Sequence, residues 1–306
     1  MPSPQSPARS SNAARDYTLF GATVLLWGTT WIALKLQLGT VAPQVSLVWR
    51  FLLAAPIMAV VARSFGAPLL FPLRTHLRFA GIGVLMFSTN FVLFYNAGAF
   101  VVSGLLSVIF SLAAVINIVL AVTVLREPLR PRVAFGALIG VAGAACLFGH
   151  EIAGTALGWK PATGLLLGVC GTFSFCLGNM LAARNQRDGI PVLSGAAWGM
   201  AYGALANAAV ALVAGSRFAI DPHPAYVLSL LWLAIPGSVV TFWAYLVLLG
   251  RIGPDRAAYT AVLAPVLALV VSTLFEDYHW SPIAFLGIGL VVAGNVLVLA
   301  RRQRRA

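Results

Sequence analysis

The sequence has very little charge for its length. Of its 306 residues only 9% are charged, whereas 60% are hydrophobic. A soluble domain carries about 25% charged and about 45–50% apolar residues, because polar side chains must cover its surface. The shortage argues against an isolated soluble enzyme, a disordered chain and a disulfide scaffold. The composition predicts an integral membrane protein.

Motifs of metal, redox and nucleotide chemistry are also missing. The three cysteines lie in apolar runs with no CxxC spacing, which is typical of small buried side chains. Walker A, HExxH and GxSxG patterns and zinc-ligand spacings do not occur. This argues against ATP-driven transport within the chain and against familiar membrane hydrolases. We therefore expect no cofactor and no metal.

The net charge of +12 raises the question of nucleic acid. The basic residues, however, lie between long apolar segments instead of clustering on one solvated face. We therefore expect a lipid bilayer and a small-molecule substrate as partners, and no nucleic acid.

Ten segments are apolar and long enough to cross a bilayer, which takes about 20 residues per helix. Proline and glycine mark the short loops between them. The alternating pattern of a membrane barrel does not occur, so the sequence predicts an all-α membrane protein. The predicted spans are 17–37, 44–63, 77–98, 101–125, 131–149, 162–183, 190–214, 226–249, 256–275 and 282–300.

The basic residues predict the orientation of these spans. With the N-terminus inside, the outer side carries only Lys35, Lys160 and Arg217, and most other Lys and Arg residues between spans fall inside. Cytoplasmic loops are enriched in Lys and Arg, so both termini are predicted to be cytoplasmic. Residues 1–16 are then a disordered cytoplasmic tail and residues 301–306 a basic one.

The two halves of the chain share landmarks at a nearly constant separation. Pro43 corresponds to Pro191, 148 residues later, and Glu127 corresponds to Glu276, 149 residues later. Each half, residues 17–149 and 162–300, holds five predicted spans. Because five is odd, the second half enters the membrane from the opposite side. Such inverted repeats are typical of secondary transporters with a substrate site near the midplane.

Several motifs resemble one transporter family. They are WGTTW at 27–31, the Arg50-Phe51 pair, LREPL at 125–129 and, more loosely, AVLAPVLALVVSTLFED at 261–277. These resemble the EamA-type repeat of the drug/metabolite transporter superfamily over nearly the whole chain past residue 16, and its YddG-type amino-acid exporters in particular. The resemblance implies export and a cavity lined by spans one, three, four, six, eight and nine. The second half departs from the motif, with Ser174 in the place of Trp27.

Charged residues inside a membrane span are costly and are candidates for function. Arg50 lies in the second span, and the resemblance suggests a structural motif there. Lys35 lies at the outer end of span one, where it either snorkels or attracts a carboxylate. Glu127 and Glu276 close repeat-equivalent spans, which favours a structural role at the helix end over proton coupling.

Polar and aromatic residues at mid-span are the better candidates for a substrate site. Tyr95 and Tyr245 are 150 residues apart and hence repeat-equivalent. The alternative is helix packing or an interfacial aromatic belt. The candidate substrate-binding residues are Trp27, Thr30, Trp31, Lys35, Asn90, Tyr95, Asn179, Tyr245 and Tyr259.

These features predict an inner-membrane exporter of small metabolites, most simply neutral or aromatic amino acids, working by alternating access. Two alternatives stay open. An exporter of lipophilic cations would need a carboxylate at mid-span, and none is found. A membrane-embedded lipid-modifying enzyme would need clustered carboxylates or a His–acid pair, and only the 276–279 loop offers them.

Overall fold

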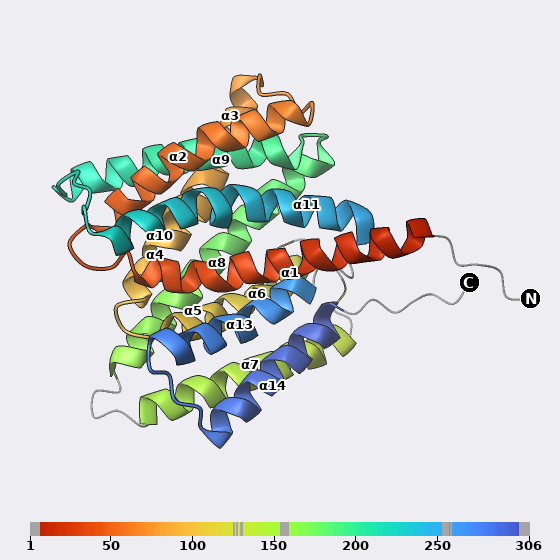
Figure 1. Ribbon diagram of the computed structural model, residues 1–306, viewed down its shortest axis with the longest axis vertical. Coiled ribbons are helices and arrows are strands. Elements are labelled where there is room, and N and C mark those ends of the chain that lie inside the picture. The colour runs from red at the N-terminus through yellow and green to blue at the C-terminus, as the bar shows by residue number, and fades with distance from the viewer. Residues whose placement is uncertain are drawn as a thin grey trace, which may run out of the picture.

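The computed structural model describes residues 7–124, 126, 128, 131–153, 159–252, 257 and 259–299. Within these residues the regular structure is entirely helical; many of the helices run lengthwise in much the same direction across the view, and others cross behind them obliquely (Figure 1). This part of the prediction is confirmed.

The helices of the first half begin with α1 (Pro7–Lys35), α2 (Pro43–Ser64) and α3 (Leu73–Ile82), and the π-helix η1 (Gly83–Thr89) joins α3 to α4 (Asn90–Ala97). The half closes with α5 (Ser103–Ser111), α6 (Ala113–Thr123) and α7 (Pro131–Ala153). The second half contains α8 (Trp159–Arg187), α9 (Val192–Val213), α10 (Pro224–Ala234), the π-helix η2 (Ile235–Val240), α11 (Thr241–Ile252), α13 (Tyr259–Phe275) and α14 (Pro282–Leu299).

Eight helical segments of the described chain are long and apolar enough to cross a membrane, and they correspond to the first eight predicted spans. The apolar helices at Tyr259–Phe275 and Pro282–Val298, where spans nine and ten were predicted, are shorter. The chain is therefore a multi-pass membrane protein. α1 begins at Pro7, well before the predicted start of span one. Proline is tolerated in the first turn because that turn's N–H groups have no partner inside the helix.

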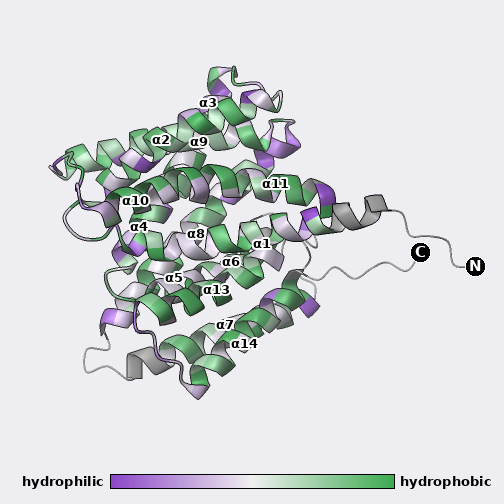
Figure 2. Cartoon of the chain, viewed as in Figure 1, coloured by the Kyte–Doolittle hydropathy of each residue, from purple (hydrophilic) through white to green (hydrophobic). Residues whose placement is uncertain are grey.

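The outer surface of the bundle is apolar, as a lipid environment requires. Leu52, Leu138, Leu166 and Phe285 are more than half exposed, and hydrophobic colour covers the helices along most of their length (Figure 2). Soluble proteins rarely expose apolar area on this scale.

Two helix pairs lie at the edges of the bundle, and each pair takes one helix from each half of the chain. α2 packs along α9 and α7 packs along α14, and the two pairs lie at opposite edges with α1 between them (Figure 1). Glycine permits the closest of these contacts. A Cβ at Gly294 of α14 would lie 2.5 Å from the backbone nitrogen of Gly140 and 2.6 Å from the carbonyl oxygen of Gly136 in α7. Small residues of this kind let helices approach backbone to backbone in membranes.

A π-helix interrupts the third helical rod of each half. Ser88 in η1 and Ser238 in η2 are 150 residues apart, so the two interruptions occupy equivalent places. Pro236 lacks a backbone N–H, which accounts for the lost α-helical bond in η2. Neighbouring side chains bind carbonyls of η1: Ser174 Oγ donates to Leu85 O at 2.8 Å. Irregular backbone is tolerated in a membrane only where such partners exist.

Candidate substrate site

Aromatic side chains from both halves meet α1 inside the bundle. The rings of Trp27 and Tyr245 lie 5.2 Å apart, which joins α1 to α11. Trp31 lies one turn further along α1. The centre of its ring is 5.2 Å from that of Phe94 in α4 and 5.6 Å from that of Phe110 in α5. The structure thus brings two predicted aromatic residues of α1 into one apolar layer between the repeats.

Thr30 lies on the same side of α1 but its hydroxyl is already used. Its Oγ1 donates to the carbonyl of Trp27 at 2.6 Å, and its methyl group packs on Gly237. A Cβ at Gly237 would lie 2.7 Å from that methyl carbon, so glycine is required for η2 to approach α1 this closely. Thr30 therefore fits α1 against η2.

Arg50 is buried between the halves, with only 4% of its surface exposed. Its Nε and Nη2 atoms lie 3.2 and 3.1 Å from Ser238 Oγ of η2, and its guanidinium lies 4.4 Å from the centre of the Phe91 ring. Ser238 in turn donates to the carbonyl of Leu233 at 2.7 Å, so its lone pairs face Arg50. Ser238 thus joins the candidate site, and nothing in the sequence singled it out.

Tyr95 and Gln37 complete this polar cluster. The Tyr95 hydroxyl donates to Gln37 Oε1 at 2.5 Å, and the Tyr95 side chain lies next to Arg50. All three side chains are buried, yet Arg50 Nη1 and Gln37 Nε2 have no hydrogen-bond partner among the described residues. Gln37 was also missed, since it lies at the very end of the first predicted span.

A second polar cluster ties α1, α5 and α13 together at one end of the bundle. Glu276 accepts hydrogen bonds from the backbone N–H of Ser103 at 2.9 Å, from the Ser103 hydroxyl, and from the Ser272 hydroxyl at 2.7 Å. Lys35 Nζ lies 3.6 Å from Glu276 Oε1 and donates to the carbonyl of Val101 at 2.8 Å. Glu276 thus caps the N-terminus of α5, whose N–H groups have no partner within the helix. We call Lys35, Glu276, Ser103 and Ser272 the latch.

The loops at this same end are also bonded across the repeats. The Thr40 hydroxyl, after α1, donates to Asp221 before α10 at 2.7 Å. This bond, with the bond from the His223 backbone N–H, lowers the pKa of Asp221 below its usual value. The Trp49 indole donates to the carbonyl of Ala219 at 3.0 Å.

In the described part of the chain, the structure does not join the remaining predicted residues to the aromatic layer or to the polar clusters. Asn90 is buried; its Nδ2 donates to the carbonyl of Met86 at 3.2 Å, and its Oδ1 has no partner among the described residues. Asn179 and Tyr259 are half-buried on α8 and α13, and no hydrogen bond or ring contact joins them to the other candidates in the described chain. Glu127 lies outside the described residues.

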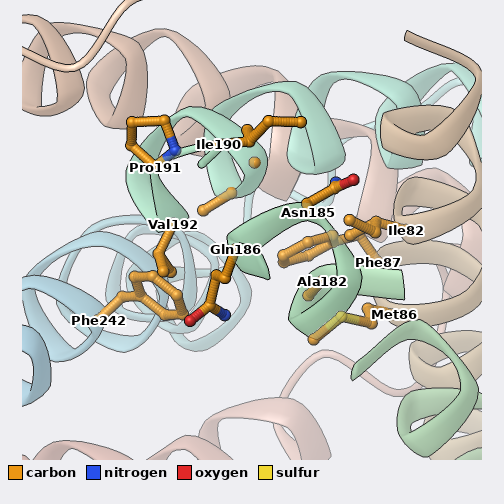
Figure 3. A pocket seen from close by; sticks show the side chains of 12 residues that line it. Ile82, Met86, Phe87, Ala182, Asn185, Gln186, Ile190, Pro191, Val192 and Phe242 are labelled. Atoms are coloured by element: carbon orange, nitrogen blue, oxygen red, sulfur yellow. The ribbon is translucent and has the colours of Figure 1, made fainter. Parts of the chain in front are cut away.

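A small cavity opens at the opposite end of the bundle from the latch. It has a volume of about 50 Å³ and lies between α3, η1, the end of α8, the start of α9 and α11 (Figure 3). Met86, Gln186 and Phe242 line it, and none of the predicted site residues does. Asn185, also in its wall, is buried with both amide atoms unpartnered among the described residues. Asn185 lies beyond the predicted end of span six, which is why the sequence did not single it out.

Comparison with known proteins identifies the family. Residues 17–149 and 162–300 each match the EamA-like transporter family. The chain belongs to this family.

The EamA-like chain is also similar to individual transporters. It is 26% identical over 285 residues to the "Uncharacterized inner membrane transporter YedA" of Escherichia coli (strain K12), covering 92% of this chain and 90% of that protein. It is 25% identical over 302 residues to a "Probable amino-acid metabolite efflux pump" of the same organism, covering 95% and 97%. A crystal structure matches with a TM-score of 0.66 over 93% of this chain and 96% of the other, at 20% identity, and thus shares the fold. The chain is a membrane transporter of the EamA type.

Proposed function

We propose that this transporter exports small neutral or aromatic amino acids by alternating access. It would cross the inner membrane ten times as two inverted five-helix repeats, with cytoplasmic termini. The observation that carries the proposal is the layer of aromatic rings around Trp27 and Trp31, which receives side chains from both halves and lies near the buried cation of Arg50. Such a lining suits an apolar side chain on a zwitterion.

Contacts at the two ends of the bundle support alternating access. The positive-inside rule places the latch outside, where Glu276 is 9% exposed and bonded to three helices. At the other end, Arg78 pairs with Asp188 and Arg251 pairs with Asp16. More than a quarter of the surface of each of these four side chains is exposed. Exposed pairs contribute about 0–1 kcal/mol each, so the inner end is held less firmly. The structure therefore fits a state closed to the outside.

Substrate class and location draw on the relatives. One full-length relative is named an amino-acid metabolite efflux pump and another an inner membrane transporter. These names, together with the site lining, favour amino-acid export from the cytoplasm over lipid modification.

Proteoliposome transport tests the proposal directly. The purified chain should move one or more neutral or aromatic amino acids under defined pH gradients, and an ethidium-like cation should not move. Failure to transport any amino acid in the panel would contradict the proposal. Transport of the cation alone would support the lipophilic-cation alternative.

The aromatic layer makes a specific prediction about affinity. Trp27→Ala removes the ring that meets Tyr245, and we expect the KM for aromatic amino acids to rise about tenfold, since a lost aromatic contact costs about 0.5–1.5 kcal/mol beyond its buried area. Trp232→Ala is the matched control, because Trp232 is 39% exposed on α10. Equal effects of the two substitutions would remove Trp27 from the site.

A further inference from the structure

We propose that Arg50, Gln37 and Tyr95 form the binding site for the carboxylate of the transported solute. The inference rests on the proposed function, because it names the group by which an amino acid is recognised. It assigns a binding role to a residue that the sequence pattern suggests is structural.

The first argument is the buried charge. Arg50 is 4% exposed, and no carboxylate forms an ion pair with it in the described part of the chain. Burying a cation is costly, and the cost falls when an anion lies against it and its N–H groups are hydrogen-bonded. Ser238 and the ring of Phe91 are neutral partners and leave the net charge in place. An arriving carboxylate would supply the missing countercharge.

The second argument compares the two repeats. Ser88 of η1 bonds Asn207 of α9 at 2.9 Å, just as Ser238 of η2 bonds Arg50 of α2. Asn207 is neutral, fully buried and fully bonded, since its Nδ2 donates to the carbonyls of Phe87 and Gly203. A neutral side chain is thus sufficient to tie a π-helix to the opposite repeat. The positive charge of Arg50 is therefore not needed to hold η2 against α2.

The third argument is the pair of free donors. Arg50 Nη1 and Gln37 Nε2 are buried without acceptors, and Tyr95 lies against both side chains. A buried donor without a partner is unfavourable by about 1–3 kcal/mol, so it is uncommon in native structures. A carboxylate offers two oxygens, which match these two donors, and arginine is the residue best suited to bind it.

The site also adjoins the aromatic layer. Ser238 follows Gly237, which packs on Thr30 of α1, and Tyr95 follows Phe94, which contacts Trp31. A solute held at Arg50 by its carboxylate would therefore place its side chain among these rings. Because the cluster is buried, the solute reaches it only when α2 and η2 separate, as alternation requires.

Ligand-induced thermal stabilisation tests the inference independently of transport. The purified chain in detergent is heated with L-phenylalanine, with phenylacetate, and with 2-phenylethylamine, which lacks the carboxylate, all at matched ionic strength. We expect the first two to raise the unfolding temperature in a saturable manner and the amine to have at least tenfold weaker affinity. An amine as effective as phenylalanine, or no stabilisation by either carboxylate, would overturn the inference.

Two variants and one control locate the effect. Arg50→Gln should lower the affinity for L-phenylalanine and phenylacetate at least tenfold. Arg63→Gln changes an exposed position on the same helix, so this variant should bind both compounds like the wild type. Gln37→Glu keeps the acceptor for Tyr95 but adds a resident carboxylate next to Tyr95, which itself lies next to Arg50. This variant should also bind both carboxylates at least tenfold more weakly, and it covers the case in which Arg50→Gln does not fold. Binding within twofold of wild type in either folded variant would overturn the inference. Carboxylate binding that depends on Arg50 without transport of any amino acid would refute the proposed function alone.

Discussion

Replacing Glu276 by alanine should lower the free energy of unfolding by about 3 kcal/mol. The substitution removes the acceptor for Ser103 and Ser272 and leaves the ammonium of Lys35 without its ion-pair partner. Breaking a buried ion pair costs about 3–5 kcal/mol, and we take the lower end because Lys35 is 31% exposed. Thermal unfolding of the purified protein in detergent measures the change.

Two further substitutions separate the latch from the rest of its loop. Glu276→Gln keeps an acceptor for the N-terminus of α5 but loses the charge, so it should have an intermediate effect. Asp277→Asn is the matched control, because Asp277 is exposed and has a positive φ of 52°, which asparagine tolerates. If Glu276→Ala unfolds at the wild-type temperature, the latch does not stabilise this state.

Much of the fold could be read from hydropathy. A span of apolar residues has few alternatives to a helix in a bilayer, so the first eight predicted spans appear as helices. Their ends lie within a few residues of the expected places, except that α1 already begins at Pro7. The two π-helices could not be predicted. They depend on tertiary partners such as Ser174, whose hydroxyl donates a hydrogen bond to the carbonyl of Leu85, as well as on a local signal such as Pro236.

The residues of the candidate site could be picked out from the sequence only in part, for a comparable reason. Aromatic residues of WGTTW and the repeat-equivalent Tyr245 were found because they lie in spans and share a spacing. Gln37 is the last residue of the first predicted span and Asn185 lies just beyond the end of the sixth, and polar residues are common at both kinds of position. Their significance comes from burial without partners, and burial depends on the packing of helices far apart in the sequence.

Gly294→Leu should prevent stable packing of α14 on α7. The new side chain would meet backbone atoms of Gly136 and Gly140 at 2.5–2.6 Å, and backbone cannot move aside as a flexible side chain can. Overpacking a core costs about 1–3 kcal/mol or more, and a backbone clash belongs at the upper end of that range. We expect little monodisperse protein after detergent extraction, and a markedly lower unfolding temperature in what remains.

Gly289→Leu is the control that isolates this contact from helix propensity. Gly289 lies on the same helix, and a Cβ there would meet nothing within 4 Å. Leucine favours a helix more than glycine does, so this variant should be at least as stable as the wild type. Since α7 and α14 close equivalent ends of the two repeats, a stable and monodisperse Gly294→Leu protein would mean that the repeats are held together without this pair. Instability of both variants would instead point to the membrane-facing surface of α14.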